Sequence, residues 1–346
     1  MMPGRQTLDA VWRTQLLSGL EATKDRQAVE VMWDIRKCYE NVNHAALADE
    51  ARIQGYPMSL LRLSLSSYRW KRQVVGMGGL LADPVYPAAG IVAGSSMATY
   101  EIALYMQRKL GDILAESSAT FSLHIDDLSV GVTGASVTEV IGVLAPVLAS
   151  VRCALMELGL PVAEAKSQVL CSSLAMEQEM LRHLGKWAGK VADTARRLGV
   201  DHQLRQVRIR PVRANRAKVY LTRKHVLKQL GKQGAKARVK VFQAGLLPAF
   251  LFGTELDIPN LGTLQKLRTD CIGVHGLKQT GVATALSLLA LPAAQDPKCK
   301  ALEAGIVRWH REIWYNQVVH PSHPDAIHPG VLEKALRQAQ SEEPQQ

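Results

Sequence analysis

The sequence lacks the features of a disulfide-linked, secreted or membrane-spanning protein. Its 346 residues include five cysteines, an odd number at wide spacing with no C-x-x-C pair. This pattern argues against a disulfide framework or a zinc finger and favours a reducing compartment. Residues 1–10 contain no apolar signal core, and the most apolar run, 140–151, is about 12 residues long, too short to span a bilayer. We expect a soluble intracellular protein, nuclear or cytoplasmic, with no membrane partner.

Acidic residues are missing from one long stretch. From His202 to Thr254 there is no Asp or Glu, although the whole chain carries a formal net charge of +11. The rest of the chain is close to neutral, so the excess charge belongs to this basic segment and is typical of a nucleic-acid footprint. Its cations are Arg205, Arg208, Arg210, Arg213, Arg216, Lys218, Arg223, Lys224, Lys228, Lys232, Lys236, Arg238 and Lys240.

Aspartates follow two stretches with the alternation of β-strands. Residues 28–34 alternate and end at Asp34, and residues 121–132 alternate with a change of phase at Asp126-Asp127, as in a hairpin with these residues at its tip. An isolated Asp-Asp pair is more often a solvated turn, but adjacent carboxylates repel unless a cation lies between them. If the strands are neighbours, three carboxylates meet and can bind two Mg²⁺ ions for phosphoryl transfer.

The order of elements predicts an α+β protein. Strands and helices alternate up to about residue 200 and mostly helices follow, which indicates an α+β domain and then a helical one. The residues from 319 onward are rich in Pro, His, Ser, Glu and Gln and are expected to be a disordered tail. Helices are expected over about 44–54, 57–68, 97–110, 140–158, 259–275, 281–291 and 298–318, with a short hairpin between 68 and 88.

Several motifs resemble, in order, those of reverse transcriptases of non-LTR (LINE-like) retrotransposons. The stretches are Asp34-Ile-Arg-Lys-Cys-Tyr-Glu-Asn-Val-Asn-His44, Gly90-Ile-Val-Ala-Gly-Ser-Ser96, His124-Ile-Asp-Asp127, Leu160–Lys166 and Arg197-Leu-Gly-Val200. They resemble the first palm motif, the template- and nucleotide-contacting motif, the catalytic Asp-Asp box, the lysine motif and the primer-gripping turn. Residues 247–255 and 264–271 are similar to the helical thumb. The resemblance covers roughly residues 25–280.

The resemblance implies a fold. It implies a palm with a ferredoxin-like antiparallel sheet and packed helices, followed by a helical thumb, with the fingers subdomain largely missing because only about 33 residues precede Asp34. The resulting expected domains are a residual N-terminal or fingers segment at 1–26, the palm at 27–203, the basic thumb or connection region at 204–318, and the tail at 319–346.

The resemblance also implies roles for individual residues. Asp34 and Asp126 would bind two Mg²⁺ (or Mn²⁺) ions together with the carbonyl of Ile35, and Asp127 would be a conditional metal ligand. Tyr39 would be the steric gate against a 2′-hydroxyl, and Lys166 would donate a proton to pyrophosphate. Gly94 and Ser95 would approach the nucleotide. The primer and template would be held by Leu198, Gly199, Arg205, Arg208, Arg210, Arg213, Arg216, Lys218, Arg223 and Lys224, with salt-sensitive affinity.

The implied activity is RNA-directed DNA synthesis, with an RNA template, a DNA primer and dNTPs as partners. Ala93 stands where the family usually has Gln, and Val92 and Ser96 stand where it usually has Pro. His124 replaces the usual aromatic residue. Two alternatives stay open: a catalytically inactive retroelement remnant that only binds nucleic acid, and a group II intron maturase-like protein. The sequence does not specify the oligomeric state.

Overall fold

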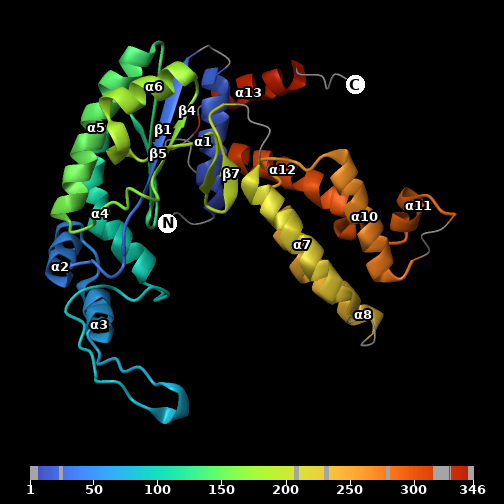
Figure 1. The fold of residues 1–346 in the computed structure, drawn as a ribbon, viewed down its shortest axis with the longest axis horizontal. Coiled ribbons are helices and arrows are strands. Elements are labelled where there is room, and N and C mark those ends of the chain that lie inside the picture. Colours follow the sequence, from blue (N-terminus) through green and yellow to red (C-terminus); the bar gives the residue numbers. More distant parts are fainter. Residues whose placement is uncertain are drawn as a thin grey trace. The chain divides into compact units, whose positions relative to one another are not determined.

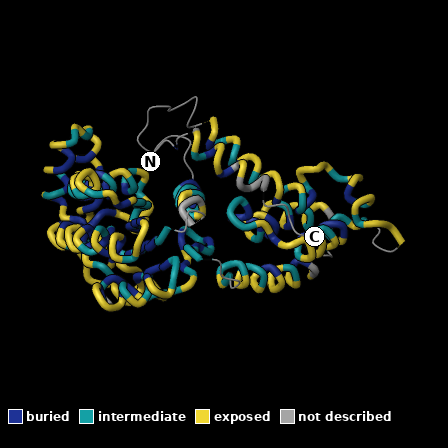
Figure 2. Tube along the Cα trace, turned by 90° about the horizontal axis from the view of Figure 1, so that it is seen from above, coloured by how far each residue is buried: buried dark blue, intermediate teal, exposed yellow. Residues whose placement is uncertain are grey.

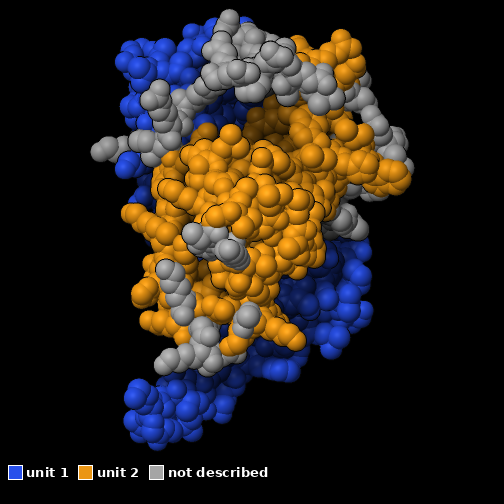
Figure 3. Space-filling model, turned by 90° about the vertical axis from the view of Figure 1, so that its right-hand side faces the viewer, with its two compact units in different colours: residues 1–10, 17–195, 203–207 blue, residues 11–16, 196–202, 208–346 orange. Residues whose placement is uncertain are grey.

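The computed structural model describes residues 7–22, 26–205, 210–229, 234–277, 281–314, 327 and 329–341. The chain divides into two compact units, shown in different colours in Figure 3. Unit 1 contains residues 1–10, 17–195 and 203–207, and unit 2 contains residues 11–16, 196–202 and 208–346. Helix α1 (Thr7–Ala22) contributes to both. Buried residues, dark blue in Figure 2, alternate with exposed ones along the helices of both units.

A five-stranded sheet is the centre of unit 1 (Figure 1), with strand order β2-β3-β1-β4-β5. The pairs β1–β3, β1–β4 and β2–β3 are antiparallel, whereas β5 is parallel to β4. The sheet is therefore mixed, which corrects the expectation of a purely antiparallel one. The elements are β1 Gln27–Asp34, α2 His44–Ile53, α3 Met58–Tyr68, the 3₁₀ turn Met77–Gly79, α4 Ala98–Ala115, β2 Thr120–His124, β3 Asp127–Gly134, α5 Val137–Glu157, β4 Gln168–Cys171, α6 Leu174–His183, the 3₁₀ turn Gly185–Ala188 and β5 Lys190–Val191.

The connectivity of unit 1 follows the β-α-β-β-α-β pattern. The chain runs from β1 through helices to the β2–β3 hairpin and then through α5 to β4, and β3 lies between β1 and β2. This is the split arrangement of ferredoxin-like domains. Its consequence for function is that β1 and β3, which carry the predicted aspartates, are direct neighbours.

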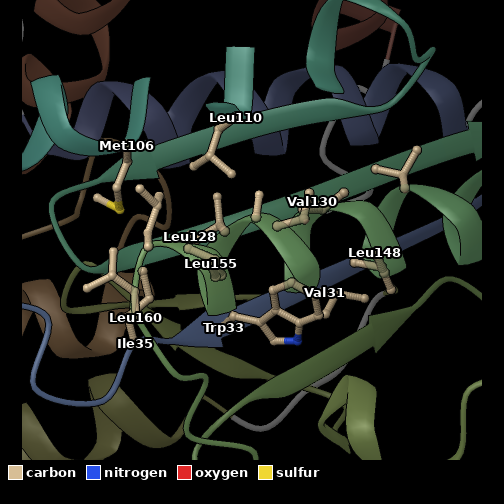
Figure 4. Packing of buried hydrophobic residues seen from close by; sticks show 14 of the residues in the cluster. Val31, Trp33, Ile35, Met106, Leu110, Leu128, Val130, Leu148, Leu155 and Leu160 are labelled. Atoms are coloured by element: carbon tan, nitrogen blue, oxygen red, sulfur yellow. The ribbon is translucent and has the colours of Figure 1, made fainter. Parts of the chain in front are cut away.

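The alternation along β1 and β3 buries one face of the sheet. Val31 and Trp33 on β1 lie opposite Val130 and Leu128 on β3, and all four are buried. Figure 4 shows these side chains packed against α5, with Leu148 and Leu155 among its contributions. Burial of each large apolar side chain contributes about 1.5–3 kcal/mol. The core therefore fixes the strand register, because a shift of one residue would expose the whole apolar row.

Helix α5 was predicted over about 140–158 and spans Val137–Glu157, so it is longer than the apolar run 140–151. It has 21 residues, and by length and composition it is the single helix in the described part of the chain that could cross a membrane. Its residues Val140, Leu144, Leu148, Val151 and Leu155 are nevertheless buried in the core of unit 1. Its apolar character is thus accounted for by packing against the sheet.

Polar side chains cap the starts of two helices of unit 1. The side chain of Asn43 accepts hydrogen bonds from the backbone N–H groups of Ala45 and Ala46 at the start of α2. Ser136 accepts from Glu139 N–H in α5 in the same way. Each such cap stabilises its helix by about 1 kcal/mol.

Unit 2 is a short hairpin and a set of helices. Leu227 of α7, Phe242, Leu247 and Leu267 are among the residues of its main apolar core. Its elements are the hairpin β6 Ala195–Arg197 and β7 Val200–His202, α7 Pro211–Gln229, α8 Ala235–Val241, the π turn Phe242–Leu246, α9 Leu247–Leu251, α10 Leu261–His275, α11 Thr284–Leu289, the 3₁₀ turn Ala293–Gln295, α12 Pro297–Trp314 and α13 Pro329–Ser341. Ala195 alone of these elements' residues counts with unit 1.

The expectation of a disordered tail over 319–346 is corrected for part of it. Residues Pro329–Ser341 form α13, and Leu332 packs in a small apolar cluster with Trp12 and Ile327. The rings of Trp12 and Trp309 meet edge to face, with centroids 5.2 Å apart. The polar composition of this stretch led to the prediction of disorder, but the few apolar residues of α13 share one face of an amphipathic helix.

The five cysteines are free thiols, and burial divides them into two groups. Burial raises the pKa of Cys38 and of Cys171 to about 12 and that of Cys271 to about 11, whereas Cys153 and Cys299 are exposed. A thiol pKa raised by two to three units lowers the reactive thiolate fraction at pH 8 by about 10²–10³. We expect Ellman's reagent to titrate two thiols rapidly in the folded chain and all five after denaturation. A third fast thiol in the folded chain would contradict this packing, and Cys153→Ser should remove one fast thiol.

Candidate active site

Two aspartates lie directly opposite each other at one end of the sheet. The register pairs Asp34 of β1 with Asp127 of β3, and Asp127 with His124 of β2. Since Trp33 and Leu128 point into the core, their neighbours Asp34 and Asp127 lie on the opposite face. Like charges directly opposite in a sheet destabilise the pairing. The fold therefore holds two like-charged carboxylates opposite each other, and the imidazole of His124 is next in the same row.

The turn of the β2–β3 hairpin presents Asp126. The turn residues are Ile125 and Asp126, and Ile125 has φ +61°, a left-handed conformation that a β-branched residue rarely adopts. Such strain costs on the order of 1–3 kcal/mol and persists where the surrounding structure enforces it. Asp126 is exposed, and its negative charge raises the pKa of both Cys38 and Tyr39 after the larger effect of burial. The hairpin tip thus lies close to the loop that follows β1.

Tyr39 is held in that loop by bonds to a second loop, Gly90–Ser96. Its side chain is half-buried and hydrogen-bonded to Thr99, and its backbone carbonyl accepts from Ile91 N–H at 2.8 Å. Gly90 N–H donates to the carbonyl of Val42 at 2.8 Å. Gly90 has φ +87°, and a Cβ there would lie 2.9 Å from the carbonyl oxygen of Glu40. Only glycine permits this close contact between the two loops.

A buried chain of hydrogen bonds determines whether the Ser95 hydroxyl can donate or accept a hydrogen bond to a ligand. The Tyr68 hydroxyl donates to Oε2 of the fully buried Glu101 at 2.6 Å and lies 3.0 Å from Ser95 Oγ. Because the single Tyr68 proton goes to the carboxylate, Ser95 must donate its own proton to Tyr68, and it accepts from Met97 N–H at 3.3 Å. Ser95 is therefore left as an acceptor toward any ligand. Gly94, with φ +95°, has open space around it.

Lys166 completes the row on the far side of Asp34. Its Nζ lies 3.5 Å from Asp34 Oδ2, and the two side chains are 74% and 36% exposed. Lys166 lies in the turn before β4, and its backbone N–H donates to the carbonyl of Ala163 at 2.9 Å. The carbonyl of Asp34 accepts from Ala163 N–H at 2.8 Å, which fixes the segment leading to Lys166. An exposed ion pair stabilises a fold by at most about 1 kcal/mol, so the main effect of this pair is to keep the Lys166 ammonium beside Asp34.

The carboxylates offer the chemistry of a divalent-cation site. Asp34, Asp126, Asp127 and the carbonyl of Ile35 are all oxygen donors, which Mg²⁺ prefers. In the part of the chain that the structure describes, no group of three or more His, Cys, Asp or Glu side chains is arranged to hold a metal ion. The donor types fit Mg²⁺, and the cationic partner seen beside Asp34 is the ammonium of Lys166.

A comparison with known families decides the affiliation of the chain. The sequence model of the family described as reverse transcriptase (RNA-dependent DNA polymerase) matches residues 1–202, more than half of the length. The chain belongs to the reverse transcriptase family. The matched region includes Asp34, Asp126 and Asp127 and ends with β7. A search of the curated proteins gives no significant match.

Solved structures similar to this reverse transcriptase include telomerases from two yeasts. Apo telomerase from Candida tropicalis, truncated from the C-terminal domain, is 13% identical over 57% of this chain and 38% of its own, with a TM-score of 0.40. Telomerase from C. tropicalis in complex with the TWJ fragment of telomeric RNA is 11% identical over 96% of this chain and 53% of its own, with a TM-score of 0.42. The corresponding complex from Candida albicans is 9% identical over 96% and 53%, with a TM-score of 0.40. The chain spans about half or less of the length of these proteins.

The predicted primer-gripping turn of this reverse transcriptase is locked to α7. Leu198 (φ +46°) and Gly199 (φ +86°) form the tip of the β6–β7 hairpin. The Arg216 guanidinium donates to the carbonyl of Gly199 and to that of Phe252, the latter at 2.7 Å, and lies 4.8 Å from the centroid of the Phe252 ring. Asp201 accepts from the backbone N–H groups of Val212 and Arg213 at the start of α7. These contacts fix the position of the hairpin relative to α7.

Many cations of the basic segment are engaged within the chain. Arg213 donates to Asp257 at 2.5 Å, and Arg210 lies 3.6 Å from the same carboxylate. Lys224 pairs with Asp270, and in unit 1 Arg205 pairs with Asp193. Burial lowers the pKa of Arg216, the arginine that donates to the carbonyls of Gly199 and Phe252. Lys218 and Arg223 are exposed on α7, whereas Arg208 lies outside the described residues.

Sequence reasoning missed the buried groups that support the predicted site. Glu101 and Tyr68 hold Ser95, and His44 Nε2 lies 2.7 Å from the carbonyl of Gly90. Arg69 Nε donates to His44 Nδ1 at 3.2 Å, so the other ring nitrogen carries the proton and donates to Gly90. The available signal was Glu101 on an otherwise apolar face of α4, because buried acids are nearly always partnered.

Proposed function

We propose that the chain is an RNA-directed DNA polymerase domain that transfers a nucleotide from a dNTP to a primer 3′-hydroxyl. The observation that carries this proposal is the pairing of Asp34 with Asp127 beside the strained Asp126 turn, in a chain of the reverse transcriptase family. Like charges directly opposite each other destabilise a sheet, whereas a pair of carboxylates suits the binding of the two divalent ions used in phosphoryl transfer. Residues 27–203 form the palm of this proposal and residues 204–318 its thumb.

The carboxylates and their neighbours divide the work of the reaction. Asp34 and Asp126 would hold two divalent ions (Mg²⁺, with Mn²⁺ as a substitute) with the carbonyl of Ile35, and Asp127 would be a conditional ligand. Bound there, the ions would supply activation of the primer hydroxyl and stabilisation of the leaving oxygen. Lys166, anchored beside Asp34, donates a proton to pyrophosphate.

The two bonded loops shape the nucleotide pocket of the proposal. Tyr39 is the gate whose ring excludes a 2′-hydroxyl, and its position depends on the bond from Ile91. Gly94 leaves room for a close approach of the ligand. Ser95 offers an acceptor oxygen, which suits donor groups on the template or nucleotide.

The helical unit is the proposed duplex-holding part. Leu198 and Gly199 contact the primer, and the exposed Lys218 and Arg223 contact phosphates. Arg210, Arg213, Arg216 and Lys224 act mainly by positioning the hairpin and α7, which follows from their internal contacts. Arg205 is paired with Asp193 and belongs with these positioning residues, whereas Arg208 is proposed to contact a phosphate. The partners are an RNA template and a DNA primer.

The origin of the domain is a further part of the proposal. The motif order favours a non-LTR retroelement acting inside the cell, in the nucleus or cytoplasm. An inactive remnant that only binds nucleic acid is the second candidate, and Ala93 in the nucleotide-contacting loop is the residue that favours it. A group II intron maturase-like role would use the basic segment for RNA splicing.

Primer extension on poly(rA)/oligo(dT) with dTTP and Mg²⁺ or Mn²⁺ tests the proposal. We expect incorporation by the natural chain and none by the Asp126→Asn/Asp127→Asn variant, with duplex binding retained by both. Equal extension by the variant would contradict the assigned site. No extension by either, with salt-sensitive duplex binding, would support the remnant instead.

A further inference from the structure

Residues 69–86 form an arm that projects from unit 1. In Figure 1 it extends beyond α3, away from the sheet. Arg72 and Val85 exchange backbone hydrogen bonds of 2.9 and 2.8 Å, and Val75 pairs with Leu81 nearer the tip. Every residue of the arm is exposed. A two-stranded ribbon of this kind is marginally stable by itself in water.

The base of the arm is fixed to the proposed nucleotide pocket. Arg69 donates to His44, which in turn holds the carbonyl of Gly90. Arg72 donates to the carbonyl of Tyr68 at 3.2 Å, and Tyr68 is bonded to Ser95. The base therefore has a defined position relative to the Gly90–Ser96 loop, although its side chains face water.

Two aromatic rings and two cations lie together at this base. Trp70 is 68% exposed and Tyr86 is 69% exposed, one on each strand of the arm. Lys71 and Arg72 follow Trp70 directly on the first strand, and both are exposed. Tyr86 follows Val85, the partner of Arg72, on the second strand. From residue 54 to residue 100 the chain carries four cations, Arg62, Arg69, Lys71 and Arg72, against a single anion, Asp83.

We propose that the base of the arm binds single-stranded nucleic acid, namely the unpaired template ahead of the site. The inference rests on the proposed polymerase function. Exposed rings stack on bases only where the bases are unpaired, and neighbouring cations neutralise the phosphates. The excess of positive charge matches a polyanion rather than a neutral protein surface. The bonded base then aligns the incoming strand with the Gly90–Ser96 loop.

The tip of the arm presents a different surface. Residues 73–82 carry no charge, and Met77 is 96% exposed. Such an apolar ribbon could join a second copy of the chain, and this is the rival that the experiment must exclude. Met77→Ala provides a matched control, because it removes an exposed apolar side chain that nucleic-acid binding at the base does not use.

Fluorescence anisotropy with two labelled hairpin duplexes tests the inference on the full chain without dNTPs. One duplex is blunt, and the other has a single-stranded 5′ overhang of about ten nucleotides, within the usual site size for single strands. We expect Trp70→Ala to weaken binding of the overhang duplex by about tenfold, the size of one lost stacking contact, and to leave blunt-duplex binding unchanged. Trp70→Phe should retain most of the affinity, and Lys71→Ala should reduce the salt slope by about 0.7.

The outcomes separate the arm from the polymerase. Equal weakening of both duplexes by Trp70→Ala, or no weakening of either, would overturn the inference. A dimer in sedimentation velocity that Met77→Ala dissociates, with overhang binding unaffected by Trp70→Ala, would assign the arm to protein contact instead. Selective loss of overhang binding in a chain that extends no primer would support the arm and count against the polymerase. Thermal melts of each variant identify any that fail to fold.

Discussion

Replacing Asp34 by asparagine is expected to reduce primer extension by at least about 10³-fold in kcat/KM, or about 4 kcal/mol of transition-state stabilisation. An amide keeps the shape of the side chain but removes the negative charge that a divalent ion requires. The ammonium of Lys166 also loses its partner 3.5 Å away. Steady-state incorporation of dTTP, with duplex affinity measured separately, checks the prediction.

Glu40→Gln is the matched control for Asp34→Asn. Glu40 is an exposed acid in the same loop, and its replacement removes one charge without touching the carboxylate row. We expect near-natural activity from it. The Asp34→Asn chain should unfold at nearly the natural free energy, because relief of the repulsion from Asp127 offsets the exposed pair with Lys166. Comparable activity of the two variants would remove Asp34 from the site.

Gly90→Ala is expected to destabilise the chain by about 2–4 kcal/mol, because an alanine there combines left-handed strain with overlap. The backbone has φ +87°, and the new Cβ would lie 2.9 Å from the backbone oxygen of Glu40, which cannot rotate away. The loops would separate and disturb the Ile91–Tyr39 bond. Denaturant unfolding measures the stability, and primer extension at low temperature measures the effect on the pocket.

Gly94→Ala separates the two contributions to the Gly90 effect. Gly94 has a similar φ of +95°, but a Cβ there meets nothing within 4 Å. Only the backbone strain remains, about 1–2 kcal/mol. If Gly90→Ala and Gly94→Ala destabilised the chain equally, the close approach of the two loops would have no energetic importance.

Local patterns in the sequence were sufficient for the elements that carry the site. Alternation up to Asp34 and across Asp126-Asp127 predicted a strand and a hairpin, although the turn is Ile125-Asp126 and Asp127 already belongs to β3. The helix expected over about 44–54 is α2. These signals are readable because each depends on neighbours within a few residues. The parallel strand β5 was not predictable, since two residues carry too little pattern.

The sequence by itself determined which chemical groups the chain has and in which local elements they stand: carboxylates at strand ends, glycines in loops, and cations in one segment. Only the tertiary structure decided which of these groups are exposed and free to contact a ligand. In the sequence, Arg216, Lys218 and Lys224 are three similar cations of one basic segment. In the fold, Arg216 lies beside Phe252 and Lys224 beside Asp270, whereas Lys218 is exposed. The physical reason is that availability depends on partners distant in sequence, and on the desolvation that burial imposes on a charge.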